Sequence, residues 1–156
     1  MAVWPSGSNQ SGYRNAAICP EGHVATSDID LSPDLVGKHC KECGGFILTK
    51  CPSCENRIRG FYHVPGVLSL APYNPPNYCE DCGSAFPWVV ARLKVATELT
   101  DELVISEDER VKIKESLNDI TRNTPRMSVA VIRLKKLLGS AKNAVGQTLW
   151  KITIDL

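Results

Sequence analysis

The segment Cys40-Lys-Glu-Cys-Gly-Gly-Phe-Ile-Leu-Thr-Lys-Cys-Pro-Ser-Cys54 contains two Cys-x2-Cys pairs separated by seven residues. Outward from it, the pair recurs at Cys79-Glu-Asp-Cys82, and Cys19-Pro-Glu-Gly-His23 offers a cysteine and a histidine at a similar spacing. Two thiolates two residues apart can both reach one Zn²⁺ from a tight turn, here called a knuckle, and a glycine after the second thiolate helps the backbone bend. The spacing therefore predicts metal binding.

The distribution of cysteines favours metal ligation over other uses of thiols. All seven lie between residues 19 and 82, and six of them form pairs, which burial as small apolar residues does not explain. A redox pair of thioredoxin type would need a βαβ context that is missing here. No basic segment followed by an apolar one marks a secretory signal. We therefore expect a reducing cytoplasm, where thiols bind metal rather than form disulfides.

Eight ligands would complete two tetrahedral zinc sites. Cysteines supply seven, and His23 is the best eighth because Gly22 lets its segment turn back. His39 would have to point back across its own knuckle, and His63 lies in a strand-like segment. The predicted ligands of two structural Zn²⁺ ions per chain are Cys19, His23, Cys40, Cys43, Cys51, Cys54, Cys79 and Cys82.

Three arrangements of these ligands remain open. Sequential pairing joins Cys19 and His23 to the pair at 40–43, and the pair at 51–54 to that at 79–82; the intervening gaps suit zinc-ribbon hairpins. A nested arrangement would join the two middle pairs, and a cross-braced one would combine alternate pairs. The spacing fixes the ligands but not the topology.

Composition divides the chain near residue 87. Nine of the ten prolines lie at or before this position, whereas Leu, Val, Ile, Lys and Glu dominate afterwards. We expect a flexible leader over 1–13, a double zinc-ribbon domain over 14–86 and a helical region over 87–156. Strand-like segments are 45–49, 57–62 and 67–70. The predicted class is a small α+β fold, in which a metal-stabilised double zinc ribbon of short β-hairpins and knuckles precedes an α-helical C-terminal region of three to four helices.

Capping residues and apolar spacing locate these helices. Pro87 fits the first turn of a helix that ends near residue 103, because its missing N–H is not needed there. Ser106 and Glu109 form a capping box for a second helix. Thr124-Pro125 opens a third helix that ends near residue 138. The tail over 143–156 has spacing for a helix and some alternation of a strand, and a helix is favoured.

Charge weakens one common use of zinc knuckles. The formal net charge is +1; residues up to 90 carry six Lys or Arg against eight acids, and those from 91 onward carry twelve against nine. Seven thiolates and two Zn²⁺ would bring the first part to about −5. A metal-bearing half with negative charge is a poor binder of the phosphate backbone, which argues against a DNA-binding zinc finger.

The knuckles resemble an uncharacterised bacterial family of zinc-ribbon proteins of unknown function. The resemblance rests on Cys-Pro-Glu-Gly-His-Val at 19–24, Cys-x2-Cys-Gly at 40–44, Cys-Pro-x-Cys with Ile-Arg-Gly over 51–60, and Tyr-Cys-x2-Cys-Gly with Phe-Pro-Trp over 78–88. It covers residues 17–90, and the helical tail matches in kind only. It implies a cytoplasmic bacterial protein with structural zinc, without a known reaction or partner.

The leading hypothesis is a non-enzymatic module that binds a protein partner or another copy through its helical region, since four-ligand sites leave no open position for substrate. No segment approaches the roughly 18 apolar residues of a membrane span. A nucleic-acid-binding alternative would use the basic positions Arg122, Arg126, Arg133 and Lys136, or Arg57 and Arg59 with Tyr62. An ordinary solvated face is the preferred interpretation of the basic positions, because acids elsewhere nearly balance their charge.

An enzyme is the least favoured reading. It would require His23 to be a bystander, so that Cys19, Cys40 and Cys43 hold an exposed metal. His63, Glu80 and Asp81 are its candidate acid–base groups, but no spacing links them, and the sequence contains no phosphate loop or nucleophile elbow.

Overall fold

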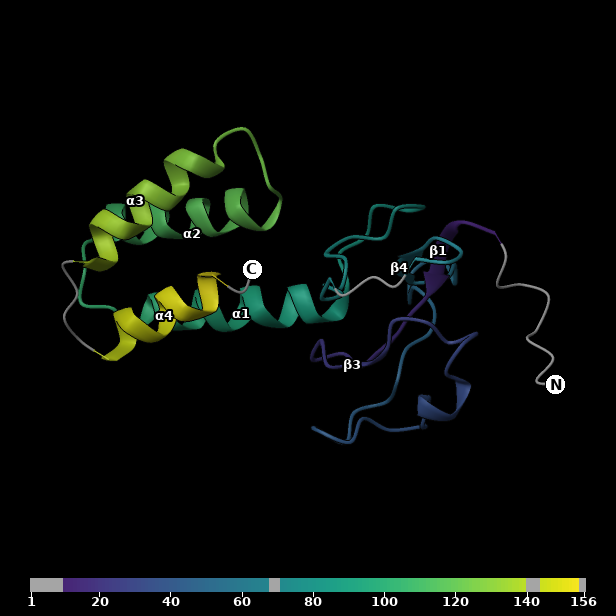
Figure 1. The fold of residues 1–156 in the computed structure, drawn as a ribbon. Coiled ribbons are helices and arrows are strands. Elements are labelled where there is room, and N and C mark those ends of the chain that lie inside the picture. Colours follow the sequence, from purple (N-terminus) through teal and green to yellow (C-terminus); the bar gives the residue numbers. More distant parts are fainter. Residues whose placement is uncertain (1–9, 68–70, 140–143, 155–156) are drawn as a thin grey trace, which may run out of the picture. The chain divides into compact units, whose positions relative to one another are not determined.

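The structure is a computed structural model that describes residues 10–67, 71–139 and 144–154 (Figure 1). The chain divides into two compact units, Met1–Trp88 and Val89–Leu156, here called the ribbon unit and the helical unit. Short antiparallel strands in the first and helices in the second give the small α+β fold that the sequence predicts.

Two short antiparallel pairs of strands form the ribbon unit. Strand β1 (Gly12–Asn15) pairs with β4 (Arg59–His63), and β2 (Ala17–Ile18) pairs with β3 (Val24–Thr26). A 3₁₀ turn, η1, follows at Pro33–Leu35. The register of β1 on β4 shifts between Tyr13 and Asn15, which marks a β-bulge.

The predicted segments agree only partly with these strands. Strand β1 begins at Gly12, inside the segment for which the sequence predicts a leader, and residues 1–9 lie outside the described part. The expected strand at 57–62 appears as β4. The one at 45–49 makes only isolated bridges, from Phe46 to His39 and from Leu48 to Ile18. The last expected strand falls mostly on residues 68–70, which are not described.

The three Cys-x2-Cys knuckles share one backbone pattern. In each, the first cysteine donates its N–H to the carbonyl five residues on and accepts an N–H from the residue four positions on. A β-bridge flanks each turn, at His39 and Phe46, at Lys50 and Arg57, and at Tyr78 and Ala85. The residue at the fourth position has positive φ, which is the conformation that glycine adopts most easily. These residues are Gly44, Glu55 and Gly83.

A small apolar core lies behind the knuckles. Ile18, Ile58 and Phe86 are buried, and Trp88 stacks on Phe86 with ring centroids 4.6 Å apart. The Trp88 Nε1–H donates to the carbonyl of Pro76 at 3.0 Å, so the only polar atom of this buried ring has a partner.

The described part of the helical region contains four helices: α1 (Pro87–Asp101), α2 (Glu107–Thr121), α3 (Met127–Gly139) and α4 (Ala144–Ile154). The predicted capping box is present, because Ser106 and Glu109 bond reciprocally at the start of α2. Helix α3 begins later than predicted: Thr124 and Pro125 form a turn, closed by a bond from the Met127 N–H to the Thr124 carbonyl. The ambiguous tail is helical as far as Ile154.

All four helices contribute to one apolar core (Figure 1). Ile113, Leu117 and Ile120 of α2 are buried there, as are Ala130 and Leu134 of α3. Within the described ranges, no helix combines the length and apolarity needed to cross a membrane.

Candidate metal centres

The eight predicted ligands gather in two groups of four. Cys19, His23, Cys40 and Cys43 form the first centre, and Cys51, Cys54, Cys79 and Cys82 form the second; within each, the ligand atoms all lie within 4.8 Å of one another. The grouping is the sequential one of the three arrangements left open by the spacing.

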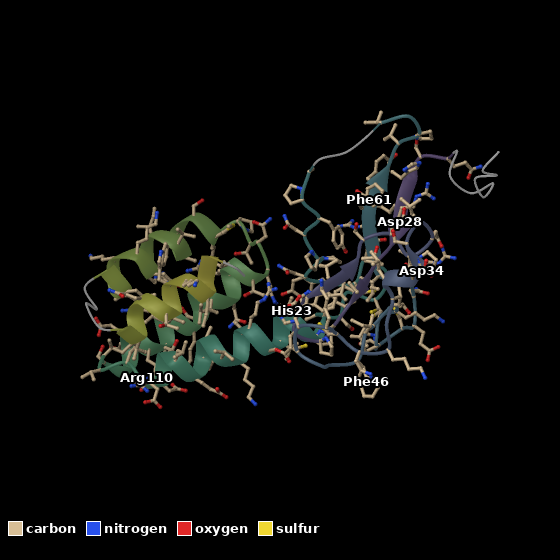
Figure 2. The ribbon with its side chains drawn as sticks, turned by 60° about the horizontal axis from the view of Figure 1, so that its bottom comes forward. His23, Asp28, Asp34, Phe46, Phe61 and Arg110 are labelled. Carbon is tan, nitrogen blue, oxygen red and sulfur yellow. The ribbon has the colours of Figure 1, made fainter. Side chains whose placement is uncertain are left out.

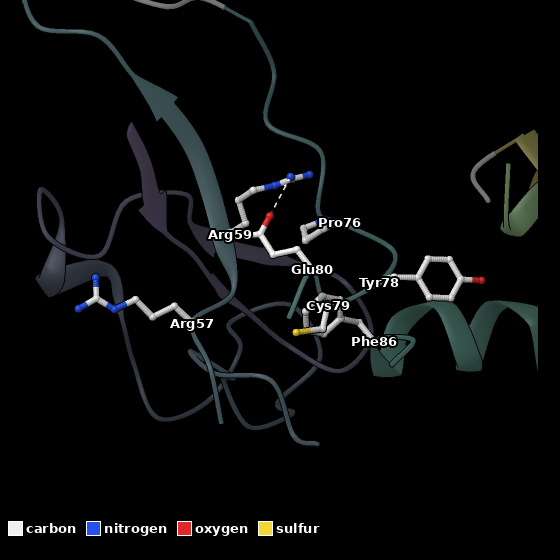
Figure 3. A pocket seen from close by; sticks show the side chains of 7 residues that line it. All are labelled: Arg57, Arg59, Pro76, Tyr78, Cys79, Glu80 and Phe86. Atoms are coloured by element: carbon white, nitrogen blue, oxygen red, sulfur yellow. Dashed lines mark hydrogen bonds and ion pairs between the residues drawn. The ribbon is translucent and has the colours of Figure 1, made fainter. Parts of the chain in front are cut away.

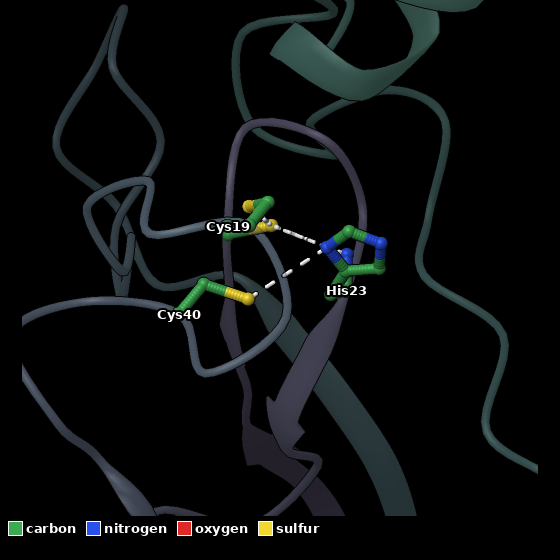
Figure 4. A group of neighbouring side chains, drawn as sticks. Cys19, His23 and Cys40 are labelled. Atoms are coloured by element: carbon green, nitrogen blue, oxygen red, sulfur yellow. Dashed lines mark hydrogen bonds between the residues drawn. The ribbon is translucent and has the colours of Figure 1, made fainter.

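His23 turns its Nδ1 toward the sulfurs of the first centre (Figure 4). This nitrogen lies 3.4 Å from the Cys19 Sγ and 3.7 Å from the Cys40 Sγ, and the Cys43 Sγ lies 3.6 Å from that of Cys19. The ring arrives there because β2 and β3 form a hairpin around Gly22, whose φ is 89°.

Sulfur separations in the second centre are equally close. The Sγ of Cys51 lies 3.7 Å from that of Cys82, and the Sγ of Cys54 lies 3.7 Å from that of Cys79. The edge of a tetrahedron is about 1.6 times the distance from centre to corner, so Zn–S bonds of about 2.3 Å place sulfurs about 3.8 Å apart. The geometry therefore fits four-coordinate zinc in both groups.

Burial differs systematically within each knuckle. The first cysteines, Cys40, Cys51 and Cys79, are buried, whereas Cys43 and Cys82 are exposed. His23 is exposed as well. Each centre thus lies at the surface of the ribbon unit, with its first thiols anchored in the interior.

Backbone N–H groups point at the sulfurs of the first centre. The His23 N–H donates to Cys19 Sγ at 3.3 Å, and the Glu42 N–H donates to Cys40 Sγ at 3.4 Å. Burial acts to raise the pKa of Cys40, but the N–H groups of Cys43 and Glu42 outweigh it and lower the pKa to about 7. Donors aimed at sulfur favour the thiolate, which is the form that binds metal.

Two thiols of the second centre have pKa values shifted in opposite directions. The hydroxyl and N–H of Ser84 lower the pKa of Cys82 to about 6. The N–H of Asn56 acts to lower the pKa of Cys54, but burial and the neighbouring cysteines prevail and raise it to about 12. Four clustered thiols cannot all ionise without a counter-charge, and a divalent cation supplies one.

The remaining histidines and the candidate acid–base residues join neither group. The ring of His39 lies against that of Phe46, with centroids 4.6 Å apart, and His63 is on β4 beside Phe61; Figure 2 labels both phenylalanines. Glu80 forms an ion pair with Arg59 at 3.1 Å, next to Cys79 in a small pocket (Figure 3). In the described part of the chain, Asp81 belongs to no metal-ligating group.

Several of the basic residues considered for nucleic-acid binding contact a neighbouring side chain. Arg59 lies over the Tyr13 ring at 4.8 Å, and Tyr13 meets Tyr62 edge to face across the β1–β4 pair. In the helical unit, Arg126 lies 3.9 Å from Asp119 and Arg133 lies 3.9 Å from Glu115. Arg57 is exposed, and Arg122 caps the end of α2.

Sequence reasoning missed two residues of the second centre. Ser84 donates to the Cys82 thiol, and Glu55 has a φ of 61° where the other knuckles have glycine. The repeat of the Cys-x2-Cys-Gly pattern could have identified the Glu55 position, because Gly44 and Gly83 stand at the equivalent place.

Fold and site together define a small α+β protein with two Cys/His clusters that could bind metal ions and a helical C-terminal region. The chain belongs to the family described as "Uncharacterized protein conserved in bacteria (DUF2321)", whose model matches residues 12–156. This membership confirms the resemblance seen in the knuckles. No curated protein and no solved structure matches the chain significantly.

Proposed function

We propose that the protein is a non-enzymatic, cytoplasmic zinc-binding module that contacts a protein partner or another copy of itself, with two structural Zn²⁺ ions per chain. The observation that carries this proposal is the gathering of all eight predicted donors into two groups of four. Three thiols with one imidazole, and four thiols, are typical donor sets of structural zinc.

Zinc would supply stability that the short strands of the ribbon unit do not provide by themselves. The strands that the structure describes in it are two to five residues long, and short two-stranded pairs are marginally stable by themselves. Each ion would connect segments that are distant in sequence, as at Cys51 and Cys82. Metal binding would then contribute directly to folding.

Four protein donors at each centre support a structural role. A catalytic zinc normally has three protein ligands and one position for water or substrate. In the first centre, the imidazole of His23 faces the sulfurs and supplies the fourth donor. A bystander histidine, which an enzyme would require here, would have no reason to adopt this orientation.

Binding to nucleic acid is a second candidate, favoured by one feature of the helical unit. Residues 120–154 contain seven Lys or Arg and no acid. A phosphate-binding surface predicts retention on DNA or RNA at low salt and a steep loss as salt rises. The ribbon unit opposes this function because it carries more acids than bases.

Native mass spectrometry of the untagged protein, purified without chelator, tests the proposal because it counts metal ions directly. We expect two zinc ions per chain and thiols that resist alkylation. His23→Ala should reduce the content to one tightly held ion. His39→Ala is the matched control, because His39 is also exposed but belongs to neither centre, and it should retain two.

Other results would contradict the proposal. An unchanged zinc content in His23→Ala would make His23 a bystander and reopen the enzymatic reading. Rapid alkylation of Cys43 or Cys82 in the loaded protein would show that a centre is open.

A further inference from the structure

Charge is strongly polarised along the helical unit. Residues 89–119 carry five Lys or Arg and eight acids, whereas residues 120–154 carry seven Lys or Arg and no acid. The first segment holds most of α1 and α2, and the second holds α3 and α4. The acids among residues 89–154 therefore lie on the first two helices and their connection, and most of the cations of the second segment lie on α3 and α4.

The basic surface is the outer side of α3. Ala130, Leu134 and Leu138 point into the core, so the positions between them on the helix face outward. Two exposed aliphatic side chains stand there, Val129 at 53% and Ile132 at 66% exposure, with Lys135 and Lys136 also exposed. Val129, Ile132, Lys135 and Lys136 are here called the basic face.

The acidic surface is the connection between α1 and α2. Six acids fall within twelve residues: Glu98, Asp101, Glu102, Glu107, Asp108 and Glu109. Val104 stands among them with 97% of its surface exposed. Residues 98–109 are here called the acidic turn.

Local ion pairs leave part of this acidic charge available. Asp101 contacts Lys114 at 2.7 Å and Arg110 at 3.4 Å, and Glu107 lies 3.4 Å from Arg110. Glu102 and Asp108 are exposed and have no side-chain partner among the described residues. The acidic turn thus combines a protruding aliphatic side chain with unpaired carboxylates.

We propose that the protein self-associates, with the acidic turn of one copy docked on the basic face of the next. Each surface has the apolar centre and the charged surroundings that the other complements, which is the arrangement that gives an interface its specificity. This inference rests on the proposed function, of which it names the partner and the surfaces.

A second copy fits the basic face better than nucleic acid or an anionic membrane does. Nucleic acid offers phosphates and base faces, for which Val129 and Ile132 provide neither charge nor stacking. Arg126 and Arg133, beside the basic face, already lie 3.9 Å from Asp119 and Glu115, which leaves few cations for a broad anionic membrane. The acidic turn offers carboxylates and an aliphatic side chain together.

The contact joins two different surfaces, so it is heterologous, and copies that add in this way form an open chain or close into a ring. Sedimentation velocity of the zinc-loaded full chain should therefore show a mass that rises with concentration beyond that of a dimer. The association should weaken when salt reduces the Debye length to about 3 Å.

Charge reversal tests both surfaces. Lys135→Glu with Lys136→Glu, and separately Glu102→Lys with Asp108→Lys, should each raise the dissociation constant roughly tenfold or more, because attraction becomes repulsion. Lys38→Glu with Lys50→Glu is the control for the first pair. It changes the net charge equally at exposed positions outside both surfaces, and it should associate as the unchanged chain does.

Mixing the two reversed variants provides the decisive result. The acidic turn of the first variant would meet the basic face of the second, so association should return in the mixture although each variant alone is weak. A monomer at all concentrations, indifference to both reversals, or a mixture that stays dissociated would each overturn self-association. Salt-sensitive binding of a monomeric chain to DNA or anionic vesicles, lost in Lys135→Glu with Lys136→Glu, would assign the basic face to a polyanion instead.

Zinc content, measured on every variant, separates this inference from the proposed function. Two ions per chain in a monomeric protein would overturn self-association and leave the zinc module standing. Fewer than two in the unchanged chain would overturn the zinc module itself.

Discussion

Gly60 shows how closely segments of the ribbon unit approach one another. It lies in β4, and a side chain added there would meet the backbone oxygens of Ser27 and Arg14. Both atoms belong to backbone, which cannot move aside as the end of a flexible side chain can. Only glycine fits this position without displacing a neighbouring segment.

Replacing Gly60 with alanine should therefore destabilise the ribbon unit by about 1–3 kcal/mol, which is the range for overpacked sites. Denaturant unfolding of the zinc-loaded protein measures the change. Gly12→Ala is the control: Gly12 also lies in a strand, β1, and has nothing within 4 Å of the added atom. Equal midpoints for the two variants would show that the close approach at Gly60 does not constrain the fold.

At the residue scale, the ligands could be predicted and their grouping could not. A knuckle is a local turn, so its two donors are fixed by their spacing. Which knuckles share an ion depends on contacts between distant segments, such as the bridge from Ile18 to Leu48. Glu55 illustrates a further limit, because its positive φ follows from the turn and not from its own preference.

At the element scale, the connection between α1 and α2 is fixed by polar contacts. The Ser106 hydroxyl accepts the Glu109 N–H, and Glu109 accepts the Ser106 N–H at 3.0 Å. Arg110 donates to the carbonyl of Asp101, the last residue of α1. These contacts join the end of one helix to the start of the next.

Protonation of Asp101 should weaken this connection. Hydrogen bonds from Lys114 and Arg110 hold the pKa of Asp101 below its usual value. The unfolded chain then binds the proton more readily than the folded one does. The contribution of Asp101 to the free energy of unfolding is therefore fully present above the ordinary aspartate pKa of about 3.9. It is lost as pH falls through the lower pKa of the folded state.

Comparison with Asp101→Asn isolates this contribution. The free energy of unfolding of the unchanged chain should exceed that of the variant at neutral pH, and the difference should shrink in acid. Metal loss in acid affects both proteins and cancels in the difference. A difference that does not depend on pH for Asp101→Asn would contradict the ion-pair account.

The elements themselves differ in how well sequence predicts them. Helices α2 and α4 were predictable because the capping box at Ser106 and the apolar spacing of the tail are local signals. The pairing of β1 with β4 was not, since Asn15 and Arg59 are distant in sequence and both strands are short. The strand expected at 45–49 is reduced to bridges because its backbone hydrogen bonds are divided among separate segments, with Lys38, Ile18 and Ile58 as partners.

At the scale of the whole molecule, the two units rely on different sources of stability. The helical unit has one apolar core to which all four helices contribute. The ribbon unit buries few large apolar side chains, chiefly Ile18, Ile58, Phe86 and Trp88. Metal should therefore matter far more to the ribbon unit than to the helical unit.

Chelation should affect the two units differently in a hydrogen-exchange experiment on the full chain. Amides of the knuckles and of β1 and β4 should lose protection when zinc is removed. Amides in the middle of α2 and α3 should keep most of theirs, because their core contains no ligand. Simultaneous loss of protection in both units would mean that they unfold together.

All four donors of the first centre are translated before any donor of the second. Cys19 and Cys43 are 24 positions apart, Cys51 and Cys82 are 31 apart, and the two spans do not overlap. A nascent chain can thus capture one ion with its first four donors while the later cysteines are still untranslated. In a nested arrangement, the first donors would lack their partners until the last pair was translated, and their thiols could meanwhile oxidise or bind metal with the wrong ligands. Because the ligands of each centre lie in one continuous stretch of sequence, the order of synthesis itself limits mispairing between ligands of the two centres.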